Sequence, residues 1–123
     1  MKYEEIIAQV AQRTGLFEGE AVELTRATLA TLAERISGAE ARDLAAQLPG
    51  PLQDALLPTQ EQPEVFSFDE FVYRVAQRCR REPTASRSAV EAVLATIREA
   101  VKPGEFDDIL SQLHRDFDRP AAR

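Results

Sequence analysis

The sequence predicts an all-α protein: a six-helix bundle made of two similar three-helix halves, with an extra short helical turn near residues 51–57. Three observations lead to this fold class. The hydrophobic 44% of the chain is mostly Ala and Leu, aromatic residues make up 7%, and there is no Trp, a composition that favours close helix packing. Apolar residues recur at helical spacing. The stretch at residues 37–52 also has a second, diverged copy 65 positions later.

The two copies align without a gap when the sequence is shifted by 65 residues. Residues 10–13 (VAQR) recur at 75–78, and residues 29–31 (LAT) recur at 94–96. A small helical repeat hides its apolar surface against its neighbour, so we expect one helical domain over residues 1–123 with an approximate two-fold axis. Its expected parts are a first half at residues 1–58, an exposed connector at 59–65, a second half at 66–118 and a frayed tail at 119–123.

The first half should contain three main helices. The spacing i, i+3, i+4, i+7 from Tyr3 to Val10 predicts a helix that ends near Arg13, because Gly15 can adopt the left-handed cap conformation. A longer helix is predicted from residue 18 to residue 36, since its first turns are rich in Glu. Its buried seam is expected to be Val22, Thr25, Leu29, Leu32 and Ile36.

Ser37 and Glu40 have the spacing of a capping box, which predicts that a third helix begins there. This helix is predicted to stop at residues 49–51 (PGP). A short helical turn should follow. We expect its leucines to exceed what the core needs and to contact a partner helix or a second copy of the chain. These residues are Leu52, Leu56 and Leu57.

The second half repeats this order. Ser67 and Glu70 predict another capping box, and a long helix follows residues 83–84 and ends at residues 103–104 (PG). Its expected seam is Val90, Leu94, Ile97 and Val101. The residues expected to close the core are Ile109, Leu110, Leu113 and Phe117.

The charge of the chain indicates which classes of partner it can bind. The net charge is −6, and residues 1–58 hold nine acids against five bases, which argues against nucleic acid as a general partner. The densest basic segment contains Arg74, Arg78, Arg80, Arg81 and Arg87. A solvated helix end explains this segment best, docking of an acidic protein comes next, and a DNA contact is the weakest interpretation.

The start of the chain and its single cysteine bear on location. Residues 1–10 carry two acids where a signal peptide would be basic, and apolar runs span only a few residues. We therefore expect a soluble, unexported, cytoplasmic protein without a membrane partner. One cysteine cannot form an internal disulfide, which agrees with a reducing compartment.

Five polar positions recur in both halves, and the ten residues at these positions are expected between helices: Arg13, Glu34, Glu40, Asp43, Gln47, Arg78, Glu99, Glu105, Asp108 and Gln112. The structural interpretation is that Arg13 fixes the angle between its own helix and the third helix by binding Asp43 or Gln47. The functional interpretation is a groove with one charge of each sign per half.

The acids of the third helices raise the question of a metal site. Across a two-fold axis, Glu40, Asp43, Glu105 and Asp108 could bring four carboxylates together. The chain has only one His, however, and helix capping explains the same acids. We therefore expect neither a metal nor a cofactor.

No catalytic set is evident. Cys79 lies between two arginines, which favour its thiolate, but it lacks a partner and is better explained as a partly buried residue at a helix end. His114 suits the carbonyl end of the last helix. Phosphate-binding loops, nucleophile elbows and zinc spacings are missing from the sequence, so we expect a protein that is not an enzyme.

Four segments carry a family resemblance: residues 3–16, 29–52, 66–78 and 93–101. They resemble a family of small bacterial proteins known only as a domain of unknown function and built from this duplicated half. Its specific part is ERxSGxEAxDLAAQLP, here residues 34–49. The resemblance implies an all-helical fold and brings no activity, catalytic residue or cofactor. The chain departs from its own first half at residues 79–82 (CRRE) and at His114.

The first functional hypothesis is a non-catalytic helical interaction module that presents a groove between its halves or associates with itself. The alternative is a carrier that binds a small apolar ligand between the halves. That carrier would need a cavity lined by Leu29, Leu32, Leu94 and Ile97.

Overall fold

The computed structural model describes residues 1–57, 61–79, 86–104 and 106–111, and all regular secondary structure among them is helical. The all-α prediction is therefore confirmed. The labelled elements are α1 (Tyr3–Thr14), α2 (Glu18–Arg35), α3 (Gly38–Gln47), α4 (Gly50–Gln53), η1 (Asp54–Leu56), α5 (Phe68–Arg78) and α6 (Arg87–Ala100). Residues 106–111 form a further helical segment.

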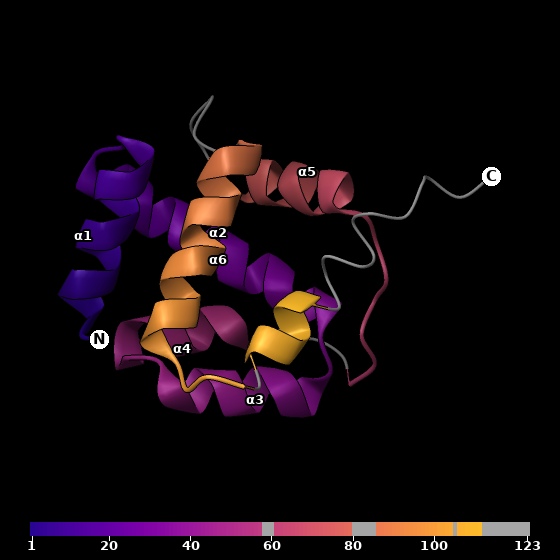
Figure 1. Cartoon of the computed structure of the whole chain (residues 1–123). Coiled ribbons are helices and arrows are strands. Elements are labelled where there is room, and N and C mark those ends of the chain that lie inside the picture. Colours follow the sequence, from indigo (N-terminus) through magenta and orange to yellow (C-terminus); the bar gives the residue numbers. More distant parts are fainter. Residues whose placement is uncertain (58–60, 80–85, 105, 112–123) are drawn as a thin grey trace.

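The long helix α2 organises the bundle. It contacts α1, α5, α6 and η1, with α5 across the top of Figure 1, α3 along the bottom and α1 at the left. Ten of its eighteen residues are buried, because it meets neighbours on several sides and a single apolar stripe is not enough for such a helix.

Helix ends follow the predicted local signals in the first half. Gly15 adopts φ 75° and its N–H donates to the Ala11 carbonyl. The Ser37 hydroxyl accepts from the Glu40 amide at 3.1 Å, and the Glu40 carboxylate accepts from the Ser37 amide at 2.9 Å. Both the glycine cap and the capping box are confirmed.

The second predicted capping box is one-sided. The Ser67 hydroxyl accepts from the Glu70 amide at 3.1 Å. The Glu70 carboxylate instead accepts from Arg74 Nε at 2.8 Å. A guanidinium one turn along the helix has thus taken the carboxylate that would have completed the box.

The buried apolar residues form one cluster that draws on both halves. The predicted seam of α6 is buried throughout, and in α2 only Val22 of the predicted seam is partly exposed. Phe106 is 1% exposed and among the largest fully buried side chains, yet the sequence reasoning did not name it. Leu113 and Phe117, expected to close the core, lie outside the described residues.

The chain between the halves is exposed at residues 61–65, as predicted, but it is also tied down. The Gly38 amide donates to the Glu61 carbonyl at 3.1 Å, and the Glu64 amide donates to the Glu34 carbonyl at 2.8 Å. We call residues 61–64 the strap. It crosses the junction between α2 and α3 and satisfies backbone groups at the end of one helix and the start of the next.

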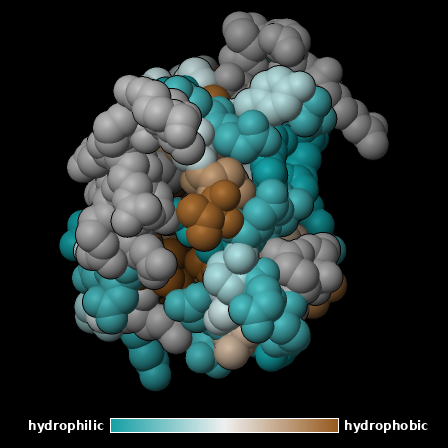
Figure 2. All heavy atoms as spheres, turned by 90° about the vertical axis from the view of Figure 1, so that its right-hand side faces the viewer, coloured by the Kyte–Doolittle hydropathy of each residue, from teal (hydrophilic) through white to brown (hydrophobic). Residues whose placement is uncertain are grey.

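The surface is mixed, with few large apolar side chains exposed. Figure 2 shows the right-hand face of Figure 1, where a small hydrophobic group is exposed beside hydrophilic residues. The most exposed large apolar residues of the described chain include Phe17, Leu57, Val65 and Tyr73. Among the described helices, none has the length and apolar content needed to cross a bilayer.

Candidate interaction groove

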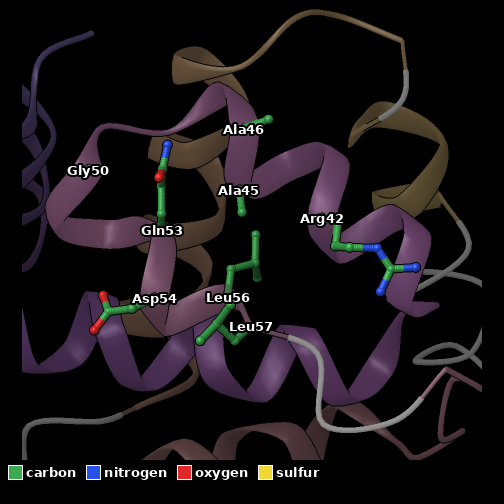
Figure 3. Close-up of a pocket in the computed structure, with 8 residues that line it drawn as sticks. All are labelled: Arg42, Ala45, Ala46, Gly50, Gln53, Asp54, Leu56 and Leu57. Atoms are coloured by element: carbon green, nitrogen blue, oxygen red, sulfur yellow. The ribbon is translucent and has the colours of Figure 1, made fainter.

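An open apolar groove lies where α3 meets α4 and η1. It has a volume of about 470 Å³, within the ordinary range for binding cavities. We call it the α3–η1 groove. Its lining residues, shown in Figure 3, are Arg42, Ala45, Ala46, Gly50, Gln53, Asp54, Leu56 and Leu57.

Local sequence builds both walls of this groove. The capping box starts α3, and the proline at residue 49 precedes the turn that begins α4. Leu52 and Leu56 are both 0% exposed, so they anchor α4 and η1 to the core. The next residue, Leu57, is 61% exposed and lies at the centre of the groove beside Leu56 (Figure 3).

This corrects the expectation that three leucines of the turn exceed what the core needs. Leu52 and Leu56 are fully buried, because α4 packs against α1 and α3 and η1 packs on α2. Only Leu57 remains exposed and available to a partner. The short turn is therefore a packed wall of the groove, with a single apolar contact point at its end.

Ion pairs border the groove on two sides. Arg42 donates to both carboxylate oxygens of Glu61, at 3.0 and 3.2 Å. On the other side Asp54 accepts from Arg26 at 2.9 and 3.1 Å. In Figure 3 Arg42 and Asp54 lie on opposite sides of the leucines.

These pairs are held weakly. The side chains of Arg26 and Asp54 are 40% and 64% exposed, and solvent-exposed pairs of this kind contribute little to stability. The pKa values of Asp54 and Glu61 lie below their ordinary range, because Arg26 and Arg42 donate hydrogen bonds to the two carboxylates. A partner could displace either pair at small cost.

The predicted basic segment is largely neutralised. Arg74 bonds to the carboxylates of Glu34, Glu64 and Glu70 at 3.3, 2.6 and 2.8 Å. Its guanidinium also lies 3.9 Å from the centre of the Phe66 ring. The hydrogen bonds to Glu64, and then to Glu70, raise the pKa of Arg74 above its ordinary value. Arg74 therefore stays charged, and its guanidinium is occupied by partners within the molecule.

The other described members of that segment, Arg78 and Arg87, are also paired with acids. Arg87 pairs with Asp69 at 2.7 Å and covers the Phe68 ring at 4.6 Å. Arg80 and Arg81 lie outside the described residues. The described part of the segment therefore does not support docking of an acidic protein or of DNA.

Arg13 contacts a different helix from the one expected. It donates to Thr96 Oγ1 at 2.9 Å and to both Glu99 oxygens at 3.0 and 2.7 Å. The predicted partners Asp43 and Gln47 are wrong, because α1 packs beside α6 as closely as it packs beside α2. Arg13 therefore fixes α1 of the first half to α6 of the second.

Arg78 makes the matching contact in the opposite direction. It donates to Thr31 Oγ1 at 2.7 Å and to Glu34 at 3.1 Å, with a second approach of 2.9 Å to that carboxylate. Arg78 lies on α5 and both acceptors lie on α2. Each half thus binds a Thr and a Glu of the other half through one Arg.

Gln47 also joins the halves. Its side-chain oxygen accepts from the Lys102 amide at 2.7 Å, while its side-chain nitrogen donates to the Asp43 carbonyl at 3.3 Å. Gln47 was predicted to lie between helices, and it holds the end of α3 to the chain that leaves α6. Its counterpart Gln112 lies outside the described residues.

Three of the four acids considered for a metal site, Glu40, Asp43 and Asp108, lie in the described part of the chain. Glu40 is used by the capping box, the Asp108 amide donates to the Gly104 carbonyl, and Glu105 lies outside the described residues. Within residues 1–57, 61–79, 86–104 and 106–111, no three His, Cys, Asp or Glu side chains are grouped to hold an ion.

Cys79 follows α5 and is buried. Burial raises the pKa of its thiol to about 11, and the nearby Glu23 carboxylate adds to the effect. The expectation that flanking arginines favour the thiolate is therefore wrong, whereas the placement at a helix end is right. His114 lies outside the described residues.

The leucines and the isoleucine expected to line a carrier's cavity do not line either of the two hollows found on the described residues. Leu29, Leu32 and Ile97 are 0% exposed, and neither the α3–η1 groove nor a second open hollow of about 570 Å³ is lined by them. That second hollow lies on the outer face of α2 and is lined by small and charged residues, including Gly19, Ala30 and Glu23.

Residues 3–119 match the family described as an uncharacterized conserved protein (DUF2267). No curated protein matches the chain.

Proposed function

The chain belongs to the uncharacterized conserved family DUF2267, and from this premise we propose that it is a non-catalytic helical module that binds a protein partner in the α3–η1 groove. The observation that carries this proposal is Leu57, which is 61% exposed in an open groove with an apolar floor. Its neighbours in the turn are needed by the core, whereas its own side chain is available for contact.

The occupant we propose is the apolar face of a basic amphipathic helix from another protein. Grooves of this kind accept helices whose apolar residues recur every three or four positions. The chain carries a net charge of −6, and residues 1–58, which supply every groove residue, hold nine acids against five bases. A basic helix is attracted to such a surface, while an acidic helix is repelled.

A synthetic helix tests this directly. The probe is an 18-residue amphipathic peptide of leucine and lysine, and its counterpart replaces each lysine with glutamate. Titration calorimetry with the full chain should give a dissociation constant of about micromolar order for the lysine peptide and no measurable heat for the glutamate peptide.

A matched pair of variants then locates the site. Leu57→Asp should weaken binding of the lysine peptide by about tenfold, because it removes apolar contact worth at least about 1.4 kcal/mol. Val65→Asp is the control, since Val65 is 71% exposed and does not line the groove. No binding by the wild-type chain, or equal losses in the two variants, would contradict the proposal.

A further inference from the structure

The surfaces through which the two halves meet are self-complementary, and this is independent of the α3–η1 groove. The first half presents an Arg donor on α1, Arg13, and an acceptor pair on α2, Thr31 and Glu34. The second half presents the donor Arg78 and the acceptors Thr96 and Glu99. Each half therefore carries both parts of the same recognition set.

The apolar part of the interface has the same property. Every buried position of α6 corresponds, 65 residues earlier, to a buried position of α2. These pairs are Leu24 and Ala89, Thr25 and Val90, Thr28 and Val93, Leu29 and Leu94, Thr31 and Thr96, and Leu32 and Ile97. The buried face that α2 contributes to the interface is therefore similar to the buried face that α6 contributes.

We propose that this interface also fits a second copy of the chain, so that two molecules can exchange halves. In the exchanged dimer the first half of one molecule packs on the second half of the other, and the Arg13, Arg78 and apolar contacts between the halves are formed between molecules. The chain passes from the first half to the second only once, between Leu57 and Phe66, so one opening separates the halves.

Two costs set when exchange occurs. The strap must release its two backbone bonds, from the Gly38 amide to Glu61 and from the Glu64 amide to Glu34. A short connector also gives the two halves of one molecule an effective concentration of about millimolar. The monomer therefore dominates at low concentration. The exchanged dimer becomes favoured when the contacts between the halves of one molecule are destabilised.

Charge reversal provides that penalty. Arg13→Glu places two glutamates together within one molecule, and Glu99→Arg places two arginines together. When the two full-length variants exchange halves, the glutamate introduced into one molecule would meet the arginine introduced into the other. The native Arg13 and the native Glu99, one from each molecule, would then also meet. Both repulsions disappear in the mixed dimer and in no monomer.

The experiment unfolds the two variants together in urea at about millimolar total concentration, refolds them by dialysis and separates the products by size-exclusion chromatography with light scattering. The expected product has twice the mass of the chain, contains one copy of each variant by native mass spectrometry, and melts several degrees above either variant alone.

A matched control keeps the charge change within one half. Arg98 pairs with Asp107 at 2.6 Å, and both residues belong to the second half, so exchange cannot repair Arg98→Glu with Asp107→Arg. This mixture should yield no mixed dimer.

A second pair guards against a variant that fails to fold by itself. Arg78→Glu with Glu34→Arg crosses the same interface and should give the same mixed dimer. Monomers alone from both interface pairs, chains that stay unfolded both alone and together, or a dimer that forms equally in the control would overturn the proposal.

Discussion

Thr25 is an unusual residue in the core. It lies on α2, is 0% exposed, and its Oγ1 has no hydrogen-bond partner among the described residues. Thr28 and Thr31 are equally buried, but their hydroxyls donate to the carbonyls of Leu24 and Ala27 at 2.8 and 2.9 Å. A buried hydroxyl without a partner costs about 1 to 3 kcal/mol, so Thr25 weakens the fold where its neighbours do not.

Thr25→Val should therefore increase the free energy of unfolding by about 1 kcal/mol, because a methyl group of nearly equal shape replaces the unpaired hydroxyl. Urea unfolding measured by circular dichroism checks this. Thr28→Val is the control and should lower the free energy of unfolding by about 0.5 to 1 kcal/mol, since it removes a hydrogen bond. Equal losses in both variants would show that Thr25 has a partner in solution.

The strap packs against the start of α3 at Gly38. Gly38 is buried at the first position of α3, and a Cβ there would lie 2.6 Å from Glu61 Oε1. A Cβ at Gly19, near the start of α2, would have nothing within 4 Å. The two glycines therefore differ in what surrounds them, although both lie in the first turn of a helix.

Gly19→Ala should raise the free energy of unfolding by about 0.5 to 1 kcal/mol through helix propensity. Gly38→Ala should gain nothing, because the new methyl group displaces the Glu61 carboxylate and breaks its pair with Arg42. In a Glu61→Ala background Gly38→Ala should stabilise as Gly19→Ala does. Thermal unfolding of the four variants measures how far the effect of Gly38→Ala on stability depends on the Glu61 side chain. The same change in stability in both backgrounds would mean that the strap does not contact Gly38.

Charge pairing makes the stability of the whole protein depend on pH in acid. Glu61 and Glu64 have pKa values below the ordinary 4.5, because Arg42 and Arg74 donate hydrogen bonds to them. The unfolded chain binds these protons at the ordinary value, so it takes up protons before the folded chain does. The stabilisation is complete above about pH 4.5 and is lost as the pH falls through the folded pKa values.

The free energy of unfolding should accordingly be flat above about pH 5 and should decrease below that. Replacing both arginine partners, Arg42→Gln with Arg74→Gln, should make the decrease shallower, because Glu61 and Glu64 then titrate near their ordinary pKa in both states. Urea unfolding from about pH 3 to about pH 7 gives the two curves. If the wild-type chain and the double variant lose free energy of unfolding in parallel as the pH falls, acids other than Glu61 and Glu64 cause the pH dependence.

Sequence reasoning predicted what is determined within a few residues along the chain. The i, i+3, i+4, i+7 spacing placed α1, Gly15 ended it, and Ser37 with Glu40 started α3, each within a residue or two of its bounds. These signals work locally, because a cap or an apolar stripe acts on its own turn of helix. The duplication and the single-domain boundaries remain predictions.

The candidate site was predicted less well. The turn after α3 was predicted to contact a partner, and it does border the α3–η1 groove, but Leu52 and Leu56 belong to the core and only Leu57 of the three leucines remains exposed. Phe106 was missed because it follows the break at Pro103 and Gly104, although it stands three residues before Ile109 and four before Leu110, which is the spacing of an apolar helical stripe. The apolar floor given by Ala45 and Ala46 had no signal of its own, since alanine suits a core, a helix surface and a groove equally.

By itself, the sequence determined the helices, most of their ends and the buried seams of α2 and α6, because spacing and capping are properties of neighbouring residues. Only the tertiary structure decided that Arg13 binds α6 and that Arg78 binds α2. It also decided that the strap crosses from α2 to α3. The physical reason is that an amphipathic helix specifies which face it buries and not which helix covers that face. That choice depends on the packing of all the helices at once.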